Sequence, residues 1–198
     1  MALSALQPIA IVTEPHRSDD VVNPPSRLRS ERLLLRLPAI GDAQAVYERY
    51  AADPEVTRYL TWAPHESAET VAAFLEDLIG RIRAGEEMCW VIARPEDDRP
   101  LGMIGTRVRA HKADIGYVLG RQWWGRGYMT EAVTAVTGWL LSEPAIVRVW
   151  AVCDTENTAS ARVLEKAGFE REGTLRRWMV LPNRSKKPRD CHVYGRVR

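Results

Sequence analysis

The sequence predicts one α/β domain built on a mixed sheet with helices on both faces. Three observations indicate this class. Apolar runs of strand length and amphipathic runs of helix length follow one another in the order β-α-α-β-β-β-α-β-α-β-β. Two stretches, residues 114–133 and 150–169, each consist of a strand pattern, a loop and a helix pattern. A chain of 198 residues is long enough for one domain with a sizeable core.

The N-terminal end of the chain differs from the rest. Residues 1–26 contain four prolines and scattered charges without a sustained hydrophobic period, so we expect a flexible tail ahead of a domain spanning residues 27–198. The apolar run from Glu31 to Leu37 predicts the first strand of that domain.

Two helices are predicted next. Asp42 is expected to cap the first, whose apolar face holds Ala43, Val46, Tyr47 and Tyr50. Ser67 is expected to begin the second, in which apolar residues recur at helical spacing: Val71, Phe74, Leu75, Leu78, Ile79 and Ile82.

The remaining strands are expected in pairs on either side of the two strand-loop-helix stretches. Met88–Ala93 and Leu101–Arg109 flank a polar turn, Pro95–Pro100. Phe169–Val180 and Cys191–Val197 close the chain, joined by a polar loop from Pro182 to Pro188.

The loop of the first strand-loop-helix stretch predicts a phosphate or pyrophosphate site. Gly125 and Gly127 can adopt positive φ and let a ligand approach the main chain, and Arg126 adds a positive charge. The helix that follows directs free N–H groups and the positive end of its dipole at the same place.

Three phosphate-binding signatures compete for this loop. The P-loop requires Lys followed by Ser or Thr after its glycine, and this chain has neither pair there. The dinucleotide fingerprint requires a third glycine where this chain has Thr130. The remaining pattern, Q/R-x-x-G-x-G/A, is met by Gln122, Gly125 and Gly127.

Two motifs carry a family resemblance. The segment from Gln122 to Gly127 resembles motif A of the GNAT superfamily of N-acetyltransferases, and Asn157–Phe169 resembles its motif B in the form N-x-x-S-x-x-x-L-E-K-x-G-F. Over about residues 27–198 the sequence is similar to the subgroup that includes the RimJ and RimL protein N-terminal acetyltransferases. The resemblance implies a single GNAT-type domain with a mostly antiparallel sheet and a splayed strand pair that binds CoA.

The resemblance also implies acetyl-CoA as cosubstrate and assigns residues to it. The backbone of Tyr117, Val118 and Leu119 is expected to bond the pantetheine arm, with an N–H of Val118 or Leu119 meeting the thioester oxygen. Asn157 and Ser160 are expected to contact the pantetheine and the thiol. The pyrophosphate is expected on the glycine loop and the helix start: Gln122, Trp124, Gly125, Arg126, Gly127, Tyr128 and Met129.

Two residues are candidates for proton transfer. Asp114 is a candidate base, acting directly or through a water, and its alternative is an ordinary surface aspartate at a strand start. Ser160 is the candidate acid, because Leu164 occupies the position of the tyrosine that many superfamily members use. Its alternative is a helix-start serine, and Tyr117 and Tyr128 are weaker candidates for the same role.

The acceptor side is less clearly marked. Tyr59, Trp62 and His65 precede the second helix and are expected to line the acceptor pocket, the alternative being a capped helix start packed on an aromatic ring. Cys153 lies near the expected thioester, but no histidine is nearby in sequence to activate it, so inert packing is favoured over an acyl-cysteine.

Composition narrows the remaining classes. The three cysteines are scattered, so neither a disulfide framework nor a metal site is expected. A net charge of +2 does not predict nucleic acid binding, and without a long apolar run or a signal peptide the chain is expected to be cytoplasmic with no membrane contact. Residues 171–198 hold nine basic and two acidic residues, a local charge of +7, which favours a solvated hairpin edge over a rim for an acidic or ribosomal partner.

These patterns predict an acetyl-CoA-dependent N-acetyltransferase that acts by direct attack in a ternary complex. The acceptor is a primary amine on a peptide or a small molecule, with a protein N-terminus, a polyamine, an amino acid and an antibiotic all open. A homodimer also stays open. The alternative is a non-catalytic CoA-binding sensor or ribosome-associated module.

Overall fold

An eight-stranded sheet runs through the computed structural model, which describes residues 22 and 24–198. Its strand order is β1-β2-β3-β4-β5-β6-β8-β7, and every neighbouring pair is antiparallel except β5 and β6. The predicted mixed, mostly antiparallel sheet is confirmed. The strands are β1 (Arg27–Arg29), β2 (Leu34–Arg36), β3 (Met88–Ala93), β4 (Gly102–Arg109), β5 (Lys112–Leu119), β6 (Arg148–Asp154), β7 (Glu170–Leu181) and β8 (Ser185–Val197).

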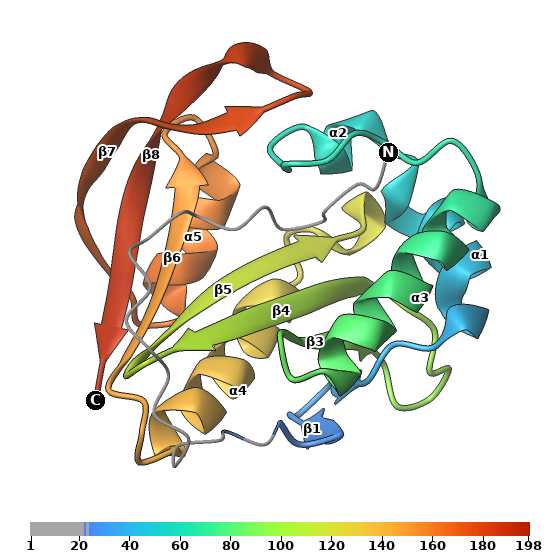
Figure 1. Ribbon diagram of the computed structural model, residues 1–198, viewed down its shortest axis with the longest axis horizontal. Coiled ribbons are helices and arrows are strands. Elements are labelled where there is room, and N and C mark those ends of the chain that lie inside the picture. The colour runs from blue at the N-terminus through green and yellow to red at the C-terminus, as the bar shows by residue number, and fades with distance from the viewer. Residues whose placement is uncertain (1–21, 23) are drawn as a thin grey trace.

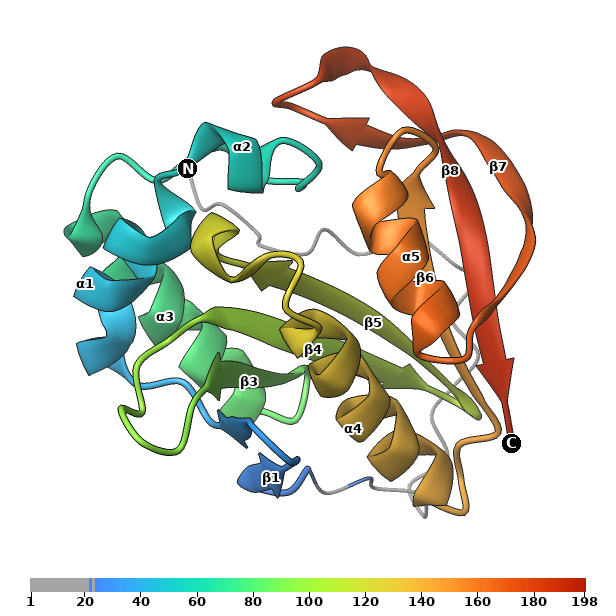
Figure 2. The ribbon, with the colours of Figure 1, turned by 180° about the vertical axis from the view of Figure 1, so that it is seen from behind.

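Helices cover both faces of this sheet, as predicted (Figures 1 and 2). They are α1 (Ala43–Val46), α2 (Pro54–Thr57), α3 (Ala68–Arg83), α4 (Tyr128–Ser142) and α5 (Thr158–Lys166), with a π turn at Tyr47–Ala51 and 3₁₀ turns at Ile40–Asp42 and Arg121–Trp123. Helices α1 and α3 pack on one face, and α4 and α5 pack on the other.

Strand β3 shows why its sequence is apolar throughout. Met88, Trp90 and Ile92 enter the core under α4, whereas Cys89, Val91 and Ala93 enter the core under α3. Because successive side chains of a strand point to opposite faces, a strand covered on both faces needs apolar residues at every position.

The expected tail lies mostly outside the described residues. Of its last residues, Val22 packs against the core under α4. The carbonyl of Pro25 accepts a hydrogen bond of 2.8 Å from the indole of Trp90. Among the described helices, none is both long and apolar enough to cross a membrane.

Several element boundaries differ from the prediction. The first strand is shorter than Glu31–Leu37 and is joined by an additional strand, β1, while α2 was not predicted. Strand β8 begins at Ser185, so the predicted Pro182–Pro188 loop is mostly strand. This part of the hairpin is polar and its register with β7 shifts, so an apolar pattern cannot reveal its backbone pairing.

The two predicted helix caps had different outcomes. Ser67 caps α3 by accepting the N–H of Thr70, as predicted. The prediction for Asp42 was wrong, because its carboxylate accepts the N–H of Ala39 and two hydrogen bonds, of 2.7 and 2.9 Å, from the guanidinium of Arg36. A buried carboxylate is stabilised better by a guanidinium fork than by one amide.

Candidate active site between two splayed strands

Strands β5 and β6 are side by side for only a short distance and then separate. Residues Lys112–Asp114 of β5 pair with residues Arg148–Trp150 of β6. Beyond Asp114, β5 stays with β4 as far as Leu119, while β6 stays with β8 as far as Asp154. The expected splayed pair is therefore present, and Figure 1 shows the opening. Within the described chain, the β5 backbone after Asp114 has no strand partner on the β6 side, so its polar groups can bond a ligand.

A cleft of about 710 Å³ occupies this opening, a volume within the range of small-molecule and cofactor sites. Most residues predicted for the site line it: Tyr59, Trp62, His65, Asp114, Tyr117, Val118, Leu119, Trp124, Gly125, Gly127, Tyr128, Met129, Asn157 and Ser160. Gln122 and Arg126 are exposed and do not contribute to its lining. Residues as far apart in the chain as Tyr59 and Ser160, which are 101 positions apart, thus share one cavity of cofactor size.

The glycine loop has the backbone geometry that the sequence predicts. Gly125 and Gly127 have φ of 73° and 80°, and α4 begins at Tyr128 with Gly127 as its N-cap residue. Gly127 has no side chain to satisfy the first N–H groups of α4, so these groups can bond an anion. A Cβ on Gly125 would meet no atom within 4 Å, so that glycine is required for its conformation and not for space.

Arg32 connects this loop to the N-terminal part of the domain. Its guanidinium forms an ion pair of 2.7 Å with Glu131 in the first turn of α4 and donates to the carbonyl of Arg126 at 3.1 Å. It also lies 4.8 Å from the centre of the Tyr128 ring. Sequence reasoning missed this role, because Arg32 and Glu131 are 99 positions apart.

The charge of Glu131 follows from its hydrogen bonds. Burial raises the pKa of this carboxyl, but hydrogen bonds from Ser30 and from the backbone and side chain of Arg32 outweigh burial and leave the pKa below its usual value. Glu131 is therefore ionised at neutral pH, and it holds Arg32 against the loop.

Ser160 and Tyr117 both line the cleft, and their side chains are hydrogen-bonded to each other. The Ser160 hydroxyl lies 2.8 Å from the phenol oxygen of Tyr117, and burial raises the pKa of Tyr117, which therefore stays protonated. The neighbouring Cys153 thiol is buried, and burial raises its pKa to about 11 despite a hydrogen bond to Ser160. A neutral, buried thiol is a poor nucleophile, which agrees with the expectation of an inert Cys153.

Asn157 and the two loop tryptophans have structural partners. The side-chain oxygen of Asn157 accepts the N–H of Ser160 at 3.1 Å and caps α5. Trp123 is buried in the core, and the guanidinium of Arg49 lies 5.1 Å from the centre of its ring. The Trp124 indole donates to the carbonyl of Leu119 at 2.7 Å, although Trp124 is 47% exposed.

A charged row crosses the floor of the cleft on the α3 face. Asp114 of β5 forms an ion pair of 2.8 Å with Arg107 of β4, and both side chains are mostly buried. Asp114 is the third residue of its strand and not a surface residue at its start, so that alternative is wrong. Glu87, just before β3, lines the same cleft and accepts from Nε of Arg81 on α3 at 3.1 Å.

Glu87 is a titratable group that sequence reasoning missed. It is 6% exposed, and burial raises the pKa of its carboxyl although Arg81 and Arg107 oppose this effect. The available signal was an acidic residue directly before a fully apolar strand. The sequence does not show that α3 covers that position.

Aromatic side chains form one wall of the cleft. The His65 ring lies 5.5 Å from the Trp62 ring and 6.0 Å from that of Phe74, and its Nδ1 is 3.1 Å from the Thr70 hydroxyl. Burial lowers the pKa of His65, so the ring is neutral at pH 7. The alternative of a capped helix start packed on an aromatic ring holds here, although His65 and Trp62 also line the cleft.

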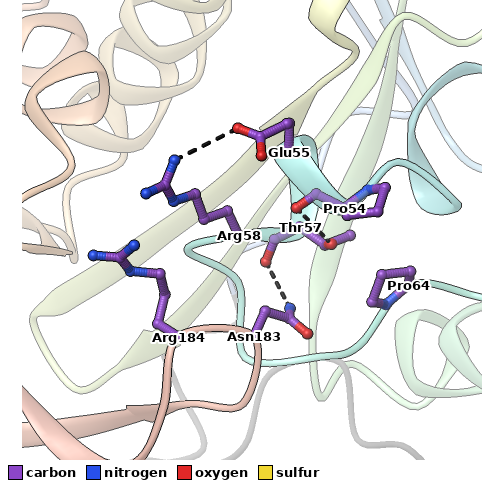
Figure 3. A pocket seen from close by; sticks show the side chains of 7 residues that line it. All are labelled: Pro54, Glu55, Thr57, Arg58, Pro64, Asn183 and Arg184. Atoms are coloured by element: carbon purple, nitrogen blue, oxygen red, sulfur yellow. Dashed lines mark hydrogen bonds and ion pairs between the residues drawn. The ribbon is translucent and has the colours of Figure 1, made fainter.

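The tip of the β7–β8 hairpin is tied to the segment after α2 (Figure 3). The amide nitrogen of Asn183 donates to the carbonyls of Thr57 and Trp62, both at 2.7 Å. Asn183 and Thr57 border a second cavity of about 350 Å³. Arg184, also at the hairpin tip, forms an ion pair with Glu156 in the loop between β6 and α5. The hairpin therefore braces the aromatic wall.

A mixed sheet opened between two parallel strands, with a glycine loop at a helix N-terminus beside the opening, defines an acetyltransferase fold. Residues 32–170 match the family described as "Acetyltransferase (GNAT) domain". The chain belongs to this family and is an N-acetyltransferase, which confirms the predicted family and enzyme class.

Three proteins illustrate the similarity. "Uncharacterized N-acetyltransferase YoaA" of Bacillus subtilis is 32% identical over 86% of this chain and 96% of its own length. The "[Ribosomal protein uS5]-alanine N-acetyltransferase" of Escherichia coli is 25% identical over 80% and 85%. The structure described as RimL, a ribosomal L7/L12 alpha-N-protein acetyltransferase in complex with coenzyme A, shares the fold with a TM-score of 0.76 at 21% identity, covering 86% of this chain and 97% of that one.

Proposed function

We propose that the domain spanning residues 27–198 transfers the acetyl group of acetyl-CoA to a primary amine by direct attack in a ternary complex. The observation that carries this proposal is the position of the glycine loop, at the N-terminus of α4 and beside the opening between β5 and β6. A pyrophosphate on the N–H groups from Gly125 to Met129 leaves the pantetheine arm free to lie along β5.

The family and the cleft support acetyl-CoA as the acetyl donor. The similar RimL structure holds coenzyme A. In the proposed complex, polar backbone groups of Tyr117, Val118 and Leu119 bond the pantetheine, and an N–H of Val118 or Leu119 stabilises the thioester oxyanion. In the same complex Gln122 and Arg126, which are exposed, contact the pyrophosphate from outside the cleft.

The leaving thiolate is served by a pair of hydroxyl groups. Ser160 is hydrogen-bonded to the Cys153 thiol on one side and to Tyr117 on the other, so it is placed beside a sulfur-containing group already. In the proposed step Ser160 gives its proton to the thiolate of CoA and regains one from water, while the phenol of Tyr117, which stays protonated, holds the Ser160 hydroxyl in place. Leu164 is buried and contributes no acid.

The acceptor enters on the side of the aromatic wall, and Tyr59, Trp62 and His65, which line the cleft, contact it. We favour a protein or peptide N-terminus, since the uS5-alanine enzyme to which the chain is similar acts on a ribosomal protein. An α-amine with a pKa of about 7.7–8.0 is already ~10% neutral at pH 7, whereas a lysine amine near 10.4 needs much stronger help from a base.

A product assay tests the proposal. The purified protein is incubated with acetyl-CoA and peptides with free N-termini, a polyamine, an amino acid or an aminoglycoside, and the release of CoA thiol and the mass of each product are measured. We expect acetylated product from at least one peptide, in an amount that matches the CoA thiol released. Binding of acetyl-CoA without product from any of these amines contradicts the proposal and favours a non-catalytic CoA-binding module.

A further inference from the structure

The floor of the cleft is hollow at one point. Gly105 of β4 and Gly116 of β5 are directly paired, and both line the cleft. Paired residues of neighbouring strands point to the same face, here the α3 face, so the missing side chains leave a gap there. A Cβ on Gly105 would lie 3.6 Å from Oε1 of Glu87 and 3.6 Å from the sulfur of Cys89. The Glu87 carboxylate therefore borders this gap.

A second group beside the same floor points to a ligand. Tyr50 is 2% exposed and lines the cleft, and its hydroxyl has no hydrogen-bond partner among the described residues. A buried hydroxyl without a partner destabilises the folded protein, and native proteins seldom leave one unmatched. A ligand in the cleft that accepts a hydrogen bond from this hydroxyl would satisfy it.

Glu87 and Asp114 are not equivalent as proton acceptors. The Asp114 carboxylate is bonded to the Arg107 guanidinium, and a proton on it would break that ion pair. Glu87 has Oε2 on Arg81 and Oε1 toward the gap. Burial raises its pKa, which brings the carboxylate closer to the basicity that general-base catalysis at neutral pH requires.

Resting on the proposed acetyl transfer, we propose that Glu87 is the general base that takes a proton from the acceptor amine, and that Asp114 with Arg107 positions that amine. The ammonium gives one proton to Glu87, which becomes a neutral carboxylic acid, and the neutral amine attacks the thioester carbon. The new N–C bond forms, the C–S bond breaks, and its electron pair stays on sulfur. The nitrogen loses its second proton to water, Ser160 protonates the sulfur and regains a proton from water, and Glu87 then releases its proton to water, so that one proton is released overall.

The charged and titratable groups around Glu87 come from every element packed against it. Arg81 of α3 and Arg107 of β4 lower its pKa, whereas Asp114 of β5 raises it. Cys89 of β3 and Tyr50 of the Tyr47–Ala51 turn lie on the same face, and burial keeps both neutral at pH 7. Removing Arg81 therefore moves the Glu87 pKa upward.

The test measures kcat/KM against pH for wild type, Glu87→Gln and Arg81→Met, with an acceptor that the product assay identifies. For Glu87→Gln we expect a loss of about 10²-fold at pH 7, no acidic limb in the profile, and unchanged CoA affinity. For Arg81→Met we expect the acidic limb to move to higher pH. The matched control is Glu86→Gln, because Glu86 is the exposed neighbour in the chain.

The possible failures are distinguishable. A Glu87→Gln profile that keeps the acidic limb of wild type overturns the role of Glu87 while acetyl transfer by wild type still stands. An unmoved limb in Arg81→Met also overturns it, and does not depend on the folding of the Glu87 variant. If wild type acetylates no amine, the proposed function and the role of Glu87 both fail.

Discussion

Replacing the glycines of the loop separates a backbone requirement from a steric one. Gly125→Ala places a Cβ in open space, whereas Gly127→Ala places one 3.3 Å from the Arg32 guanidinium. Both positions have positive φ, which costs a residue with a Cβ about 1–2 kcal/mol. If the loop takes another conformation to avoid this cost, acetyl-CoA affinity falls by roughly 5–30-fold in either variant. Gly127→Val should lose more, because a branched side chain crowds the N–H groups of α4.

The assay compares two ligands by calorimetry. Acetyl-CoA carries the pyrophosphate, and S-acetylpantetheine lacks it. We expect the loop variants to weaken acetyl-CoA and leave acetylpantetheine unchanged. Gly138→Ala is the matched control, since Gly138 lies inside α4 with no atom within 4 Å of an added Cβ. It should raise stability by about 1 kcal/mol without affecting either ligand. Unchanged acetyl-CoA affinity in Gly127→Val would refute the assignment of the loop.

Three further substitutions test the rest of the site. Ser160→Ala should lower kcat more than it raises the KM for acetyl-CoA, and a change in KM alone would make Ser160 a binding residue. Asp114→Asn should raise the acceptor KM more than it lowers kcat, because Asp114 positions the amine, with a loss in kcat/KM of no more than about 10²-fold; unchanged KM and kcat would contradict that role. Arg32→Gln should weaken acetyl-CoA about tenfold at unchanged kcat, because the loop loses charge-assisted bonds, while the same change at the exposed Arg29 should have no effect. Equal affinities of the Arg32 and Arg29 variants would show that Arg32 does not hold the loop.

The features predicted correctly from sequence are those with a local physical cause. Positive φ at Gly125 and Gly127 follows from the need of a tight loop before a helix, and Ser67 caps α3 through atoms three residues apart. Gly168, within the motif Asn157–Phe169, has a φ of 82° just after α5, which is the left-handed conformation that glycine commonly adopts at the end of a helix. The bounds of β3 were correct because an apolar strand between polar turns is recognisable without knowledge of its neighbours.

The features missed depend on contacts between distant segments. The sequence around Asp42 suits a helix cap, but in the fold its carboxylate accepts hydrogen bonds from the guanidinium of Arg36 instead. Strand β8 extends to Ser185 by pairing with β7, where Leu181 is opposite Ser185 and Met179 is opposite Arg189. The first residues of β8 are polar, so they have no hydrophobic period that could reveal this pairing. Arg32 holds a loop nearly 100 positions away, on the order of half the chain, where no short-range pattern operates.

Glu87 shows how burial by a distant element can give a residue a chemical role. In the sequence it is one of two adjacent glutamates after a helix, and only its place directly before the apolar strand β3 separates Glu87 from Glu86. The fold separates them: Glu86 stays exposed, whereas Glu87 lies under α3, beside Arg81 and over the gap left by Gly105. The cost of burying a carboxylate is the same cost that raises its pKa, so the contact that makes this residue unfavourable for stability also makes it a better base. A sequence pattern cannot supply that inference, because the basicity belongs to the packing of α3 on the sheet and not to the glutamate alone.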